Sequence, residues 1–403
     1  MSMNFEKLAN KYMDDIIKTA QELIQIKSLS LEEEAIAKYI KEKMESLGYD
    51  KVEVDDYGSV FGTITGTGEG SSLLMNCHMD VVHEGDVSKW EYPPYGAVVS
   101  NGKIYGRGAS DTKGTMAIQL YAPIILKEAG FCPKGDIVTA CVVAEENAGF
   151  GSMIHTRENR YITDYAILGE ATENNLVIGN RGRFCVVIKI HGKSCHASIP
   201  ENGKNPFDYV EKLLPLLKTV EMGKDDLFGQ STMALTKIES SEIGTNLVPN
   251  SITLYVDYRA VPVDTEEVVL SKFQNILDKC ALDEFSTEIS TLYFPLKTYT
   301  GKESVGFQGE YPYSIDPESD IVKICKETLE KHTGREIKVY PWAFATDAGH
   351  YAAKGVKCIG YSPAEIIYCH TTNDNIDLKM MEEGTIGYLA LIEAITNISK
   401  NSL

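Results

Sequence analysis

The chain has 403 residues, of which 43% are hydrophobic and 24% are charged, which is typical of a globular protein and too long for one ordinary core. Acidic residues outnumber basic ones by 58 to 39, which argues against a nucleic-acid partner, because phosphate binding requires clustered Lys and Arg. No apolar run reaches the length of about 18 residues that a membrane span requires, so no membrane partner is expected either.

The first part of the chain predicts helices followed by strands. Apolar residues at helical spacing predict two N-terminal helices, within residues 5–23 and 36–47. Ser30 and Glu33 have the spacing of a capping box for the second helix, and Gly48 is suited to end it in a left-handed conformation. The further elements expected here are strands at 59–65, 73–77, 137–144 and 165–168 and a helix at 115–129.

The pattern changes after Arg181, where the predicted strands alternate polar and apolar residues, as strands with one exposed face do. Strands are expected at 184–191, 231–238, 251–260 and 286–293, with helices at 206–219 and 266–281 between them. Helix–strand alternation then returns, with a helix at 321–332, strands at 339–344 and 356–361, and a last helix after Asp377.

This order predicts an α/β fold with two domains. Residues 1–180 and 295–403 are expected to form one domain, a mixed sheet covered by helices on both faces. Residues 181–294 are expected to form a two-layer α+β domain, inserted into the first.

The N-terminus and the cysteines favour a cytoplasmic protein. The first residues carry acidic side chains and lack the basic and apolar regions of a signal peptide. The nine cysteines are an odd number without CxxC spacing, which predicts reduced thiols.

Histidine and acidic residues gather at the ends of predicted buried strands, where open α/β sheets bind ligands. The strand at 73–77 runs into His78 and Asp80. Residues two apart in an extended chain point the same way, so the Asp80 carboxylate could hydrogen-bond the His78 imidazole and leave its other nitrogen for a metal. A surface histidine is the commoner meaning of so short a motif.

Other candidates for the same site follow along the chain. The glycines of segment 106–114 permit tight turns that could aim Asp111 at the site, although an ordinary loop with an N-cap aspartate is the alternative. Each strand-end acid by itself is more often solvated, but their joint placement favours one site. The remaining candidates are Glu145, Glu146, Glu170 and His370.

These motifs resemble those of a known family, the zinc-dependent metallopeptidases and deacylases that include acetylornithine deacetylase, succinyl-diaminopimelate desuccinylase and carboxypeptidase G. The resemblance covers nearly the whole chain in the family's order. The matching segments are HMD at 78–80, the run 90–114, AEEN at 144–147, GEAT at 169–172 and His370. Residues 194–205 and 299–313 further resemble the selenium-metabolism hydrolase (YgeY-like) branch.

Carried over residue by residue, the resemblance implies a catalytic domain with two zinc ions. His78 and Glu170 would bind one ion, Glu146 and His370 the other, and Asp111 would bridge both. Three carboxylates against two Zn²⁺ leave a single positive charge, which one bridging hydroxide neutralises. Carboxylate and imidazole ligands without thiolate suit zinc, although Co²⁺ or Mn²⁺ could substitute.

The chemistry that the resemblance implies is hydrolysis of an amide bond. Two zinc ions lower the pKa of the bridging water towards about 7. Glu145 would be the general base that takes its proton and passes it to the leaving nitrogen, and Asp80 would support the ligand His78.

The resemblance makes the inserted domain a lid and dimerisation domain. His196 matches a histidine that stabilises the oxyanion, often from the other subunit of a dimer, so a homodimer is expected. Asn246 and Arg259 match substrate-binding positions, and a guanidinium binds a carboxylate through paired hydrogen bonds. The expected substrate is a small N-acyl amino acid or dipeptide-like compound with a free carboxylate.

The sequence departs from the family at a few positions. Asp374 stands where the family commonly has glutamate, His83 stands where it often has proline, and GEAT at 169–172 replaces GEPT. The first and the last should be tolerated. His83 is either a bystander or a substrate contact.

Other functions remain open from the sequence. A cysteine nucleophile is conceivable because Cys77, Cys195 and Cys369 each precede a proposed functional histidine, but adjacent strand residues face opposite ways, which favours thiols packed behind the site. The chain has no GxSxG and no HExxH. An N-carbamoyl amino acid hydrolase, or a catalytically idle binding protein on the same fold, is the alternative.

Overall fold

Strand β3 (Leu73–His78) is buried on both faces, as its nearly apolar sequence predicts. In a computed structural model, which describes residues 3–280, 282 and 284–399, alternate residues of β3 enter different cores. Met75 and Cys77 pack into one core and Leu74 into the other. A strand in this position requires helices on both sides of its sheet.

The sheet around β3 is mixed, and its central strands are parallel. Its order is β1 (Lys51–Val54), β2 (Val60–Ile64), β6 (Ile137–Val142), β3, β7 (Tyr165–Leu168), β22 (Lys357–Gly360), β8 (Leu176–Asn180) and β20 (Tyr313–Ser314), with β21 (Val339–Trp342) paired to β8. Strands β6, β3, β7 and β22 run parallel to their neighbours in this group. Their carboxyl ends therefore meet at one edge.

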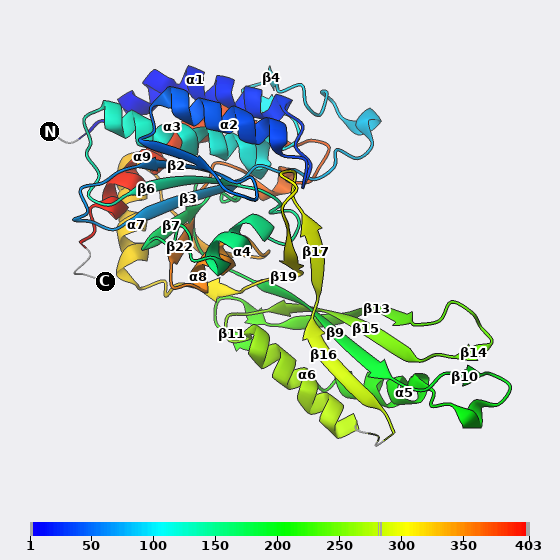
Figure 1. Cartoon of the computed structure of the whole chain (residues 1–403). Coiled ribbons are helices and arrows are strands. Elements are labelled where there is room, and N and C mark those ends of the chain that lie inside the picture. Colours follow the sequence, from blue (N-terminus) through cyan, green and yellow to red (C-terminus); the bar gives the residue numbers. More distant parts are fainter. Residues whose placement is uncertain (1–2, 281, 283, 400–403) are drawn as a thin grey trace.

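Helices cover both faces of this sheet (Figure 1). One face carries α1 (Phe5–Gln25), α2 (Glu34–Leu47), α3 (Gly114–Glu128), α7 (Asp320–Thr333) and α9 (Leu378–Thr396). On the other face lie α4 (Phe150–Arg157) and α8 (Ala348–Ala352), which contact each other. The structure confirms the predicted α/β class with helices on both faces.

One detail of the N-terminal helices differs from the prediction. Gly48 ends α2 in the left-handed region, with φ of 84°, as expected. The predicted capping box is wrong, because Ser30 does not bond the start of α2. Its hydroxyl donates to Asp80 instead, over a distance of 2.6 Å, and Glu33 accepts the backbone N–H of Leu31.

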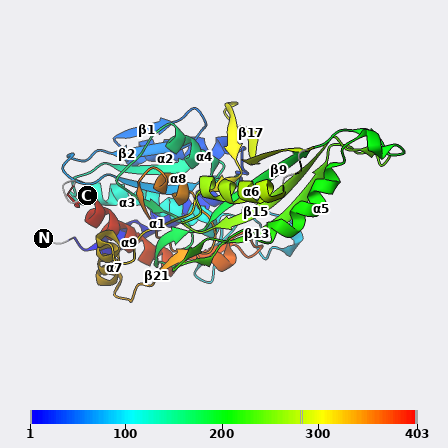
Figure 2. The same ribbon diagram turned by 90° about the horizontal axis from the view of Figure 1, so that it is seen from below.

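A second, antiparallel sheet projects from the first (Figure 1). Its strands are β13 (Thr232–Ser240), β15 (Ser251–Ala260), β9 (Gly182–His191) and β16 (Ser286–Thr291), in that order, with β19 (Gly309–Glu310) also paired to β9. Helices α5 (Pro206–Leu217) and α6 (Glu266–Cys280) lie side by side on one of its faces (Figure 2). The boundaries 181 and 294 stay predictions, and the pairing of β19 shows that this sheet includes residues beyond 294.

Short pairs of strands complete the fold. They are β4 (Val98–Ser100), β5 (Lys103–Tyr105) and β23 (Asn375–Asp377) in one small sheet, and the pairs β10 (Cys195–His196) with β14 (Leu247–Val248), β11 (Lys224–Asp225) with β12 (Gly229–Gln230), and β17 (Tyr293–Lys297) with β18 (Glu303–Phe307). No helix within the described ranges is both long and apolar enough to cross a membrane.

Candidate metal centre

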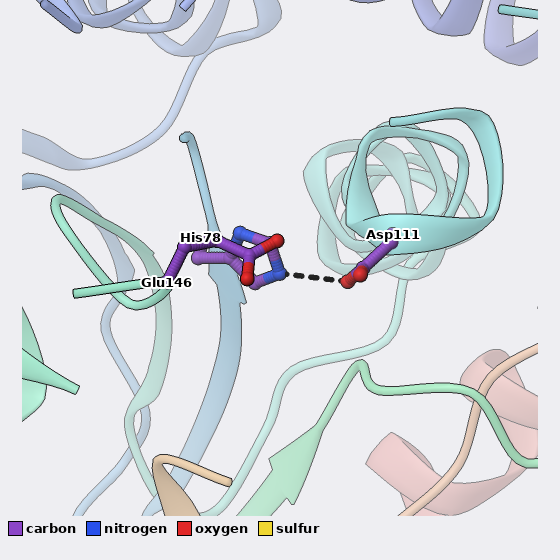
Figure 3. Close-up of side chains that lie close together, drawn as sticks. All are labelled: His78, Asp111 and Glu146. Atoms are coloured by element: carbon purple, nitrogen blue, oxygen red, sulfur yellow. Dashed lines mark hydrogen bonds and ion pairs between the residues drawn. The ribbon is translucent and has the colours of Figure 1, made fainter. Parts of the chain in front are cut away.

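The predicted ligands meet at the edge where the parallel strands end. His78 is the last residue of β3, and Glu170 follows β7 after one residue. Glu146 lies beyond the end of β6, and Asp111 lies in the segment before α3. Figure 3 shows the side chains of His78, Asp111 and Glu146 close together. The topology therefore gathers these side chains from separate parts of the chain.

Asp111 lies between two histidines and faces each with a different oxygen. Its Oδ1 is 2.9 Å from His78 Nε2, and its Oδ2 is 2.9 Å from His370 Nε2. Glu170 Oε1 lies 3.6 Å from His78 Nε2, and Glu146 Oε1 lies 2.9 Å from His370 Nε2. The five side chains therefore divide into two sets that share Asp111.

The donor set fits divalent cations. Ligand atoms of His78, Asp111 and Glu146 lie within 4.8 Å of one another, and so do those of His78, Glu145 and Glu170. The group of His78, Asp111 and Glu146 would assign Glu146 to the same ion as His78. The contact of 2.9 Å between Glu146 Oε1 and His370 Nε2 assigns it instead to the ion of His370. We favour the second division, because it gives each set one imidazole and one carboxylate besides the shared Asp111. Imidazole and carboxylate are the ligands of zinc and similar metals.

The pKa values of these groups are shifted by burial and by one another. Burial, together with the neighbouring carboxylates, raises the pKa of Glu145 well above its ordinary value and that of Glu170 to about 8. Hydrogen bonds to Asp111 and Glu146 raise the pKa of His370 to about 10. Burial opposes ionisation of Asp111, but hydrogen bonds from both histidines lower its pKa. A cluster of buried carboxylates of this kind is stabilised by bound cations.

The role predicted for Asp80 needs a correction. The His78 Nδ1 atom bonds the backbone carbonyl of Asp80 at 2.8 Å, while the nearest carboxylate oxygen is 3.6 Å away. The Asp80 carboxylate accepts the backbone N–H groups of Glu145 and Glu146 at 3.0 and 3.2 Å, and the Ser30 hydroxyl. Asp80 thus orients the candidate ligand His78 through its main chain and the glutamate pair through its side chain.

The backbone near the site adopts uncommon conformations. Ala144, which precedes the glutamate pair, has φ of 51°, and His370 has φ of 60°. Both are non-glycine residues in the left-handed region, where few such residues occur and where functional sites often place them. Neither conformation can be inferred from local sequence.

Asp374 holds the segment that carries Asp111. Its buried carboxylate accepts the backbone N–H groups of Gly108 and Ser110 at 2.7 and 3.0 Å and lies 3.2 Å from Arg107. The aspartate at the family's glutamate position therefore has a positioning contact. His83 is exposed and accepts the backbone N–H of Gly85.

The candidate residues of the second sheet lie at two different places. His196 and Asn246 are neighbours at the far end of this sheet, where Ala197 donates its N–H to the Asn246 carbonyl (Figure 1). His196 is exposed and bonds Ser198. Arg259 lies at the opposite end of β15 and bonds Asp257 at 2.7 Å. Within one chain, the fold does not bring His196 and Asn246 to the metal ligands.

Four of the candidate ligands, Asp111, Glu146, Glu170 and His370, line a pocket of about 300 Å³ together with Glu145. Its wall also contains Cys369 and Glu310, and no local motif marks Glu310 as a site residue. Burial raises the pKa of the Cys369 and Cys77 thiols, which disfavours the nucleophilic thiolate. A larger hollow of about 950 Å³ lies at the opposite edge, near Tyr165 at the start of β7, and none of the candidate ligands lines it.

Comparison with known proteins places these observations in a family. The model of peptidase family M20/M25/M40 matches residues 74–394. The uncharacterized protein YgeY of Escherichia coli K12 is 27% identical over 374 residues, which cover 91% of each chain. A succinyl-diaminopimelate desuccinylase of Wigglesworthia glossinidia brevipalpis is 30% identical over 278 residues, 66% of this chain and 73% of that protein. The fold matches YXEP of Bacillus subtilis, described as a dinuclear metal-binding peptidase from the M20 family, with a TM-score of 0.67, 13% identity and coverage of 96% and 99%.

Proposed function

The chain belongs to peptidase family M20/M25/M40, and from this we propose that it hydrolyses an amide bond in a small substrate with a free carboxylate, using two divalent metal ions. The observation that carries this proposal is the position of Asp111, whose two oxygens face His78 and His370. A carboxylate so placed is suited to bridge two ions about 3.5–4 Å apart. Zinc is the metal that this donor set suits best, with Co²⁺ and Mn²⁺ as substitutes.

The protein's own residues hold and move the proton. Two divalent ions, when bound, lower the pKa of water and polarise a carbonyl group. Glu145 accepts the proton of the attacking water and delivers it to the leaving nitrogen. Asp80 keeps Glu145 in place by accepting its backbone N–H.

The substrate is an N-acyl amino acid or a dipeptide-like compound. A free carboxylate on this substrate would be bound by Arg259. The guanidinium group of Arg259 is half-exposed, and its strand β15 ends near the large sheet (Figure 1). The name of the desuccinylase relative favours removal of an acyl group from an amino acid. The protein acts in the cytoplasm, as its N-terminal sequence and its unpaired cysteines predict.

Assembly as a homodimer completes the site. His196 and Asn246 lie at the far end of the second sheet, which favours a role for them at the metal centre of a partner subunit. In that position His196 would donate a hydrogen bond to the oxyanion. The edge strand β13, largely exposed in one chain, offers backbone groups for such an assembly.

The test is a panel of N-acyl, N-carbamoyl and dipeptide substrates, assayed on zinc-loaded protein and on the same protein after chelation. We expect hydrolysis of N-acyl amino acids or dipeptides that depends on the metal, with Glu145→Gln as the inactive control. Hydrolysis of N-carbamoyl amino acids alone would show that the protein is an N-carbamoyl amino acid hydrolase instead. Absence of turnover on the whole panel would contradict the proposal.

A further inference from the structure

Three charged side chains form a row across neighbouring strands of the second sheet. Glu310 of β19 is directly opposite Arg183 of β9, and Arg183 is directly opposite Arg259 of β15. Residues directly opposite in antiparallel strands project from the same face of a sheet. The neighbouring residues Phe184 and Tyr258 project from the opposite face and are fully buried, and Tyr258 packs against Phe273 of α6. The row therefore lies on the face that the helices do not cover.

Both arginines form ion pairs with Asp257, not with Glu310. Asp257 Oδ2 lies 2.9 Å from Arg183 Nε, and Asp257 Oδ1 lies 2.7 Å from Arg259 Nε. Asp257 thus holds both guanidinium groups from one side. Across the described ranges, no residue forms an ion pair or hydrogen bond with the Glu310 carboxylate, although Arg183 is its cross-strand neighbour.

Glu310 belongs to the metal pocket as well as to this row. Its side chain lines the same hollow of about 300 Å³ as Asp111, Glu145 and Glu170. Burial raises its pKa to about 7, and the positive charges of Arg183 and Arg259 only partly offset this. A half-buried carboxylate without a partner is costly, so this position favours a ligand that donates hydrogen bonds and carries positive charge.

We propose that Glu310 is a specificity residue, which binds a free ammonium group of the substrate while Arg259, together with Arg183, binds its carboxylate. The inference rests on the proposed hydrolase function and narrows its substrate class. Glu310 lines the pocket of the candidate ligands, and Arg183 and Arg259 follow it on the next two strands, each about 4.8 Å from the last. The free carboxylate of an N-acyl amino acid lies in the amine half, and the closeness of Glu310 to the arginines places the ammonium in that same half.

The test compares substrates that differ by one ammonium group. N2-acetylornithine and N-acetylnorvaline differ by an ammonium in the amine half, whereas glycylleucine and N-acetylleucine differ by one in the acyl half. We expect zinc-loaded wild-type protein to prefer N2-acetylornithine to N-acetylnorvaline by about 10- to 100-fold in kcat/KM, the effect of one charge-assisted hydrogen bond. Glu310→Gln should abolish this preference, because the amide keeps the size of the side chain but not its charge.

The matched control is Glu303→Gln, an exposed glutamate of the nearby strand β18 that pairs with Lys297. This variant should keep the wild-type preference. A preference that survives in Glu310→Gln would overturn the assignment. Loss of a preference only between glycylleucine and N-acetylleucine would overturn the placement of the ammonium in the amine half.

A binding measurement separates this inference from the proposed function. Calorimetric titration of zinc-loaded protein with ornithine and with norvaline requires no turnover. We expect wild-type protein to bind ornithine at least about 10-fold more tightly, and Glu310→Gln to lose the difference. If none of the four substrates is hydrolysed, the proposed hydrolase function fails and the titration still decides the role of Glu310. Equal binding of both amino acids by wild-type protein, or binding of neither, would overturn that role.

Discussion

The Asp80 carboxylate accepts the backbone N–H of Glu145 at 3.0 Å, over 65 residues of sequence. Its second oxygen accepts the adjacent N–H of Glu146 at 3.2 Å, and the ring of His78 meets the Asp80 main chain instead. One carboxylate therefore sets the position of both the proposed base and a proposed metal ligand.

Replacing Asp80 with alanine should lower turnover more than metal content. The backbone carbonyl that orients His78 remains in the variant, while the N–H groups of Glu145 and Glu146 lose their acceptor. We expect kcat to fall by about 10- to 100-fold, since misplacement of about 1 Å can cost two orders of magnitude. Asp80→Asn keeps one acceptor oxygen, so its kcat should lie between those of wild-type protein and Asp80→Ala. Zinc content is measured by mass spectrometry and kcat by steady-state kinetics. An equal loss of both would contradict the prediction that the Asp80 carboxylate chiefly positions Glu145.

Substitutions of Glu145 and Glu146 should differ in their effects on zinc content and on kcat. Glu145→Gln removes the proposed base but no ligand, so the zinc content should stay near that of wild type while kcat falls by about 10²- to 10⁴-fold. Glu146→Gln should instead lower the zinc content, because Glu146 contacts His370. A near-wild-type rate of Glu145→Gln at saturating zinc would place the base elsewhere.

Asp111 should be the residue on which both ions depend. Asp111→Ala removes the carboxylate that faces His78 and His370, and two divalent cations would then repel each other without a shared ligand. We expect metal analysis to find both ions lost in Asp111→Ala and chiefly one lost in His370→Ala. Two ions retained per chain in Asp111→Ala would exclude the bridging role.

Glu33 should make the folded protein less stable as the pH rises. Burial, and then the charge of Asp80, raises its pKa from the ordinary 4.5 to about 7, so the folded chain holds a proton that the unfolded chain has released. The stability that this group contributes is complete below the unfolded pKa and is lost as the pH rises through 7.

Glu33→Gln cannot titrate and supplies the reference for that prediction. Between about pH 5 and pH 8, the free energy of unfolding of wild-type protein should fall by roughly 2 kcal/mol relative to the variant. Urea unfolding of both metal-free proteins measures the difference, and the metal-free state avoids binding effects. A difference that is the same at both pH values would show that Glu33 is ionised in the folded protein.

His196 should restore activity across a dimer interface. Homodimers of Glu145→Gln and of His196→Ala should both turn over poorly. After the two variants are mixed under mild denaturant, half of the dimers should be mixed, each with one site that combines an intact Glu145 and an intact His196. Activity per total chain should recover towards about a quarter of wild type. No recovery, with subunit exchange confirmed by native mass spectrometry, would remove the role across the interface.

The sequence by itself predicted most of the long elements and the candidate metal ligands. Strand β15 has the predicted bounds and α3 differs from its prediction by one residue, because periodicity of two or of 3.6 residues is a local property of the chain. The residues expected to bind metal were chosen because imidazole and carboxylate groups follow buried strands, and parallel strands bring their ends to one edge.

The tertiary structure decided what these residues contact. Ser30 bonds Asp80 rather than capping α2, because the fold brings these two distant segments together. For the same reason the Asp80 carboxylate holds the distant Glu145, while the Asp80 main chain bonds His78. Glu310 reaches the metal pocket only because β19 pairs with β9, over more than a hundred residues. Periodicity contains no information on such pairings, since they depend on how sheets stack and which strands become neighbours.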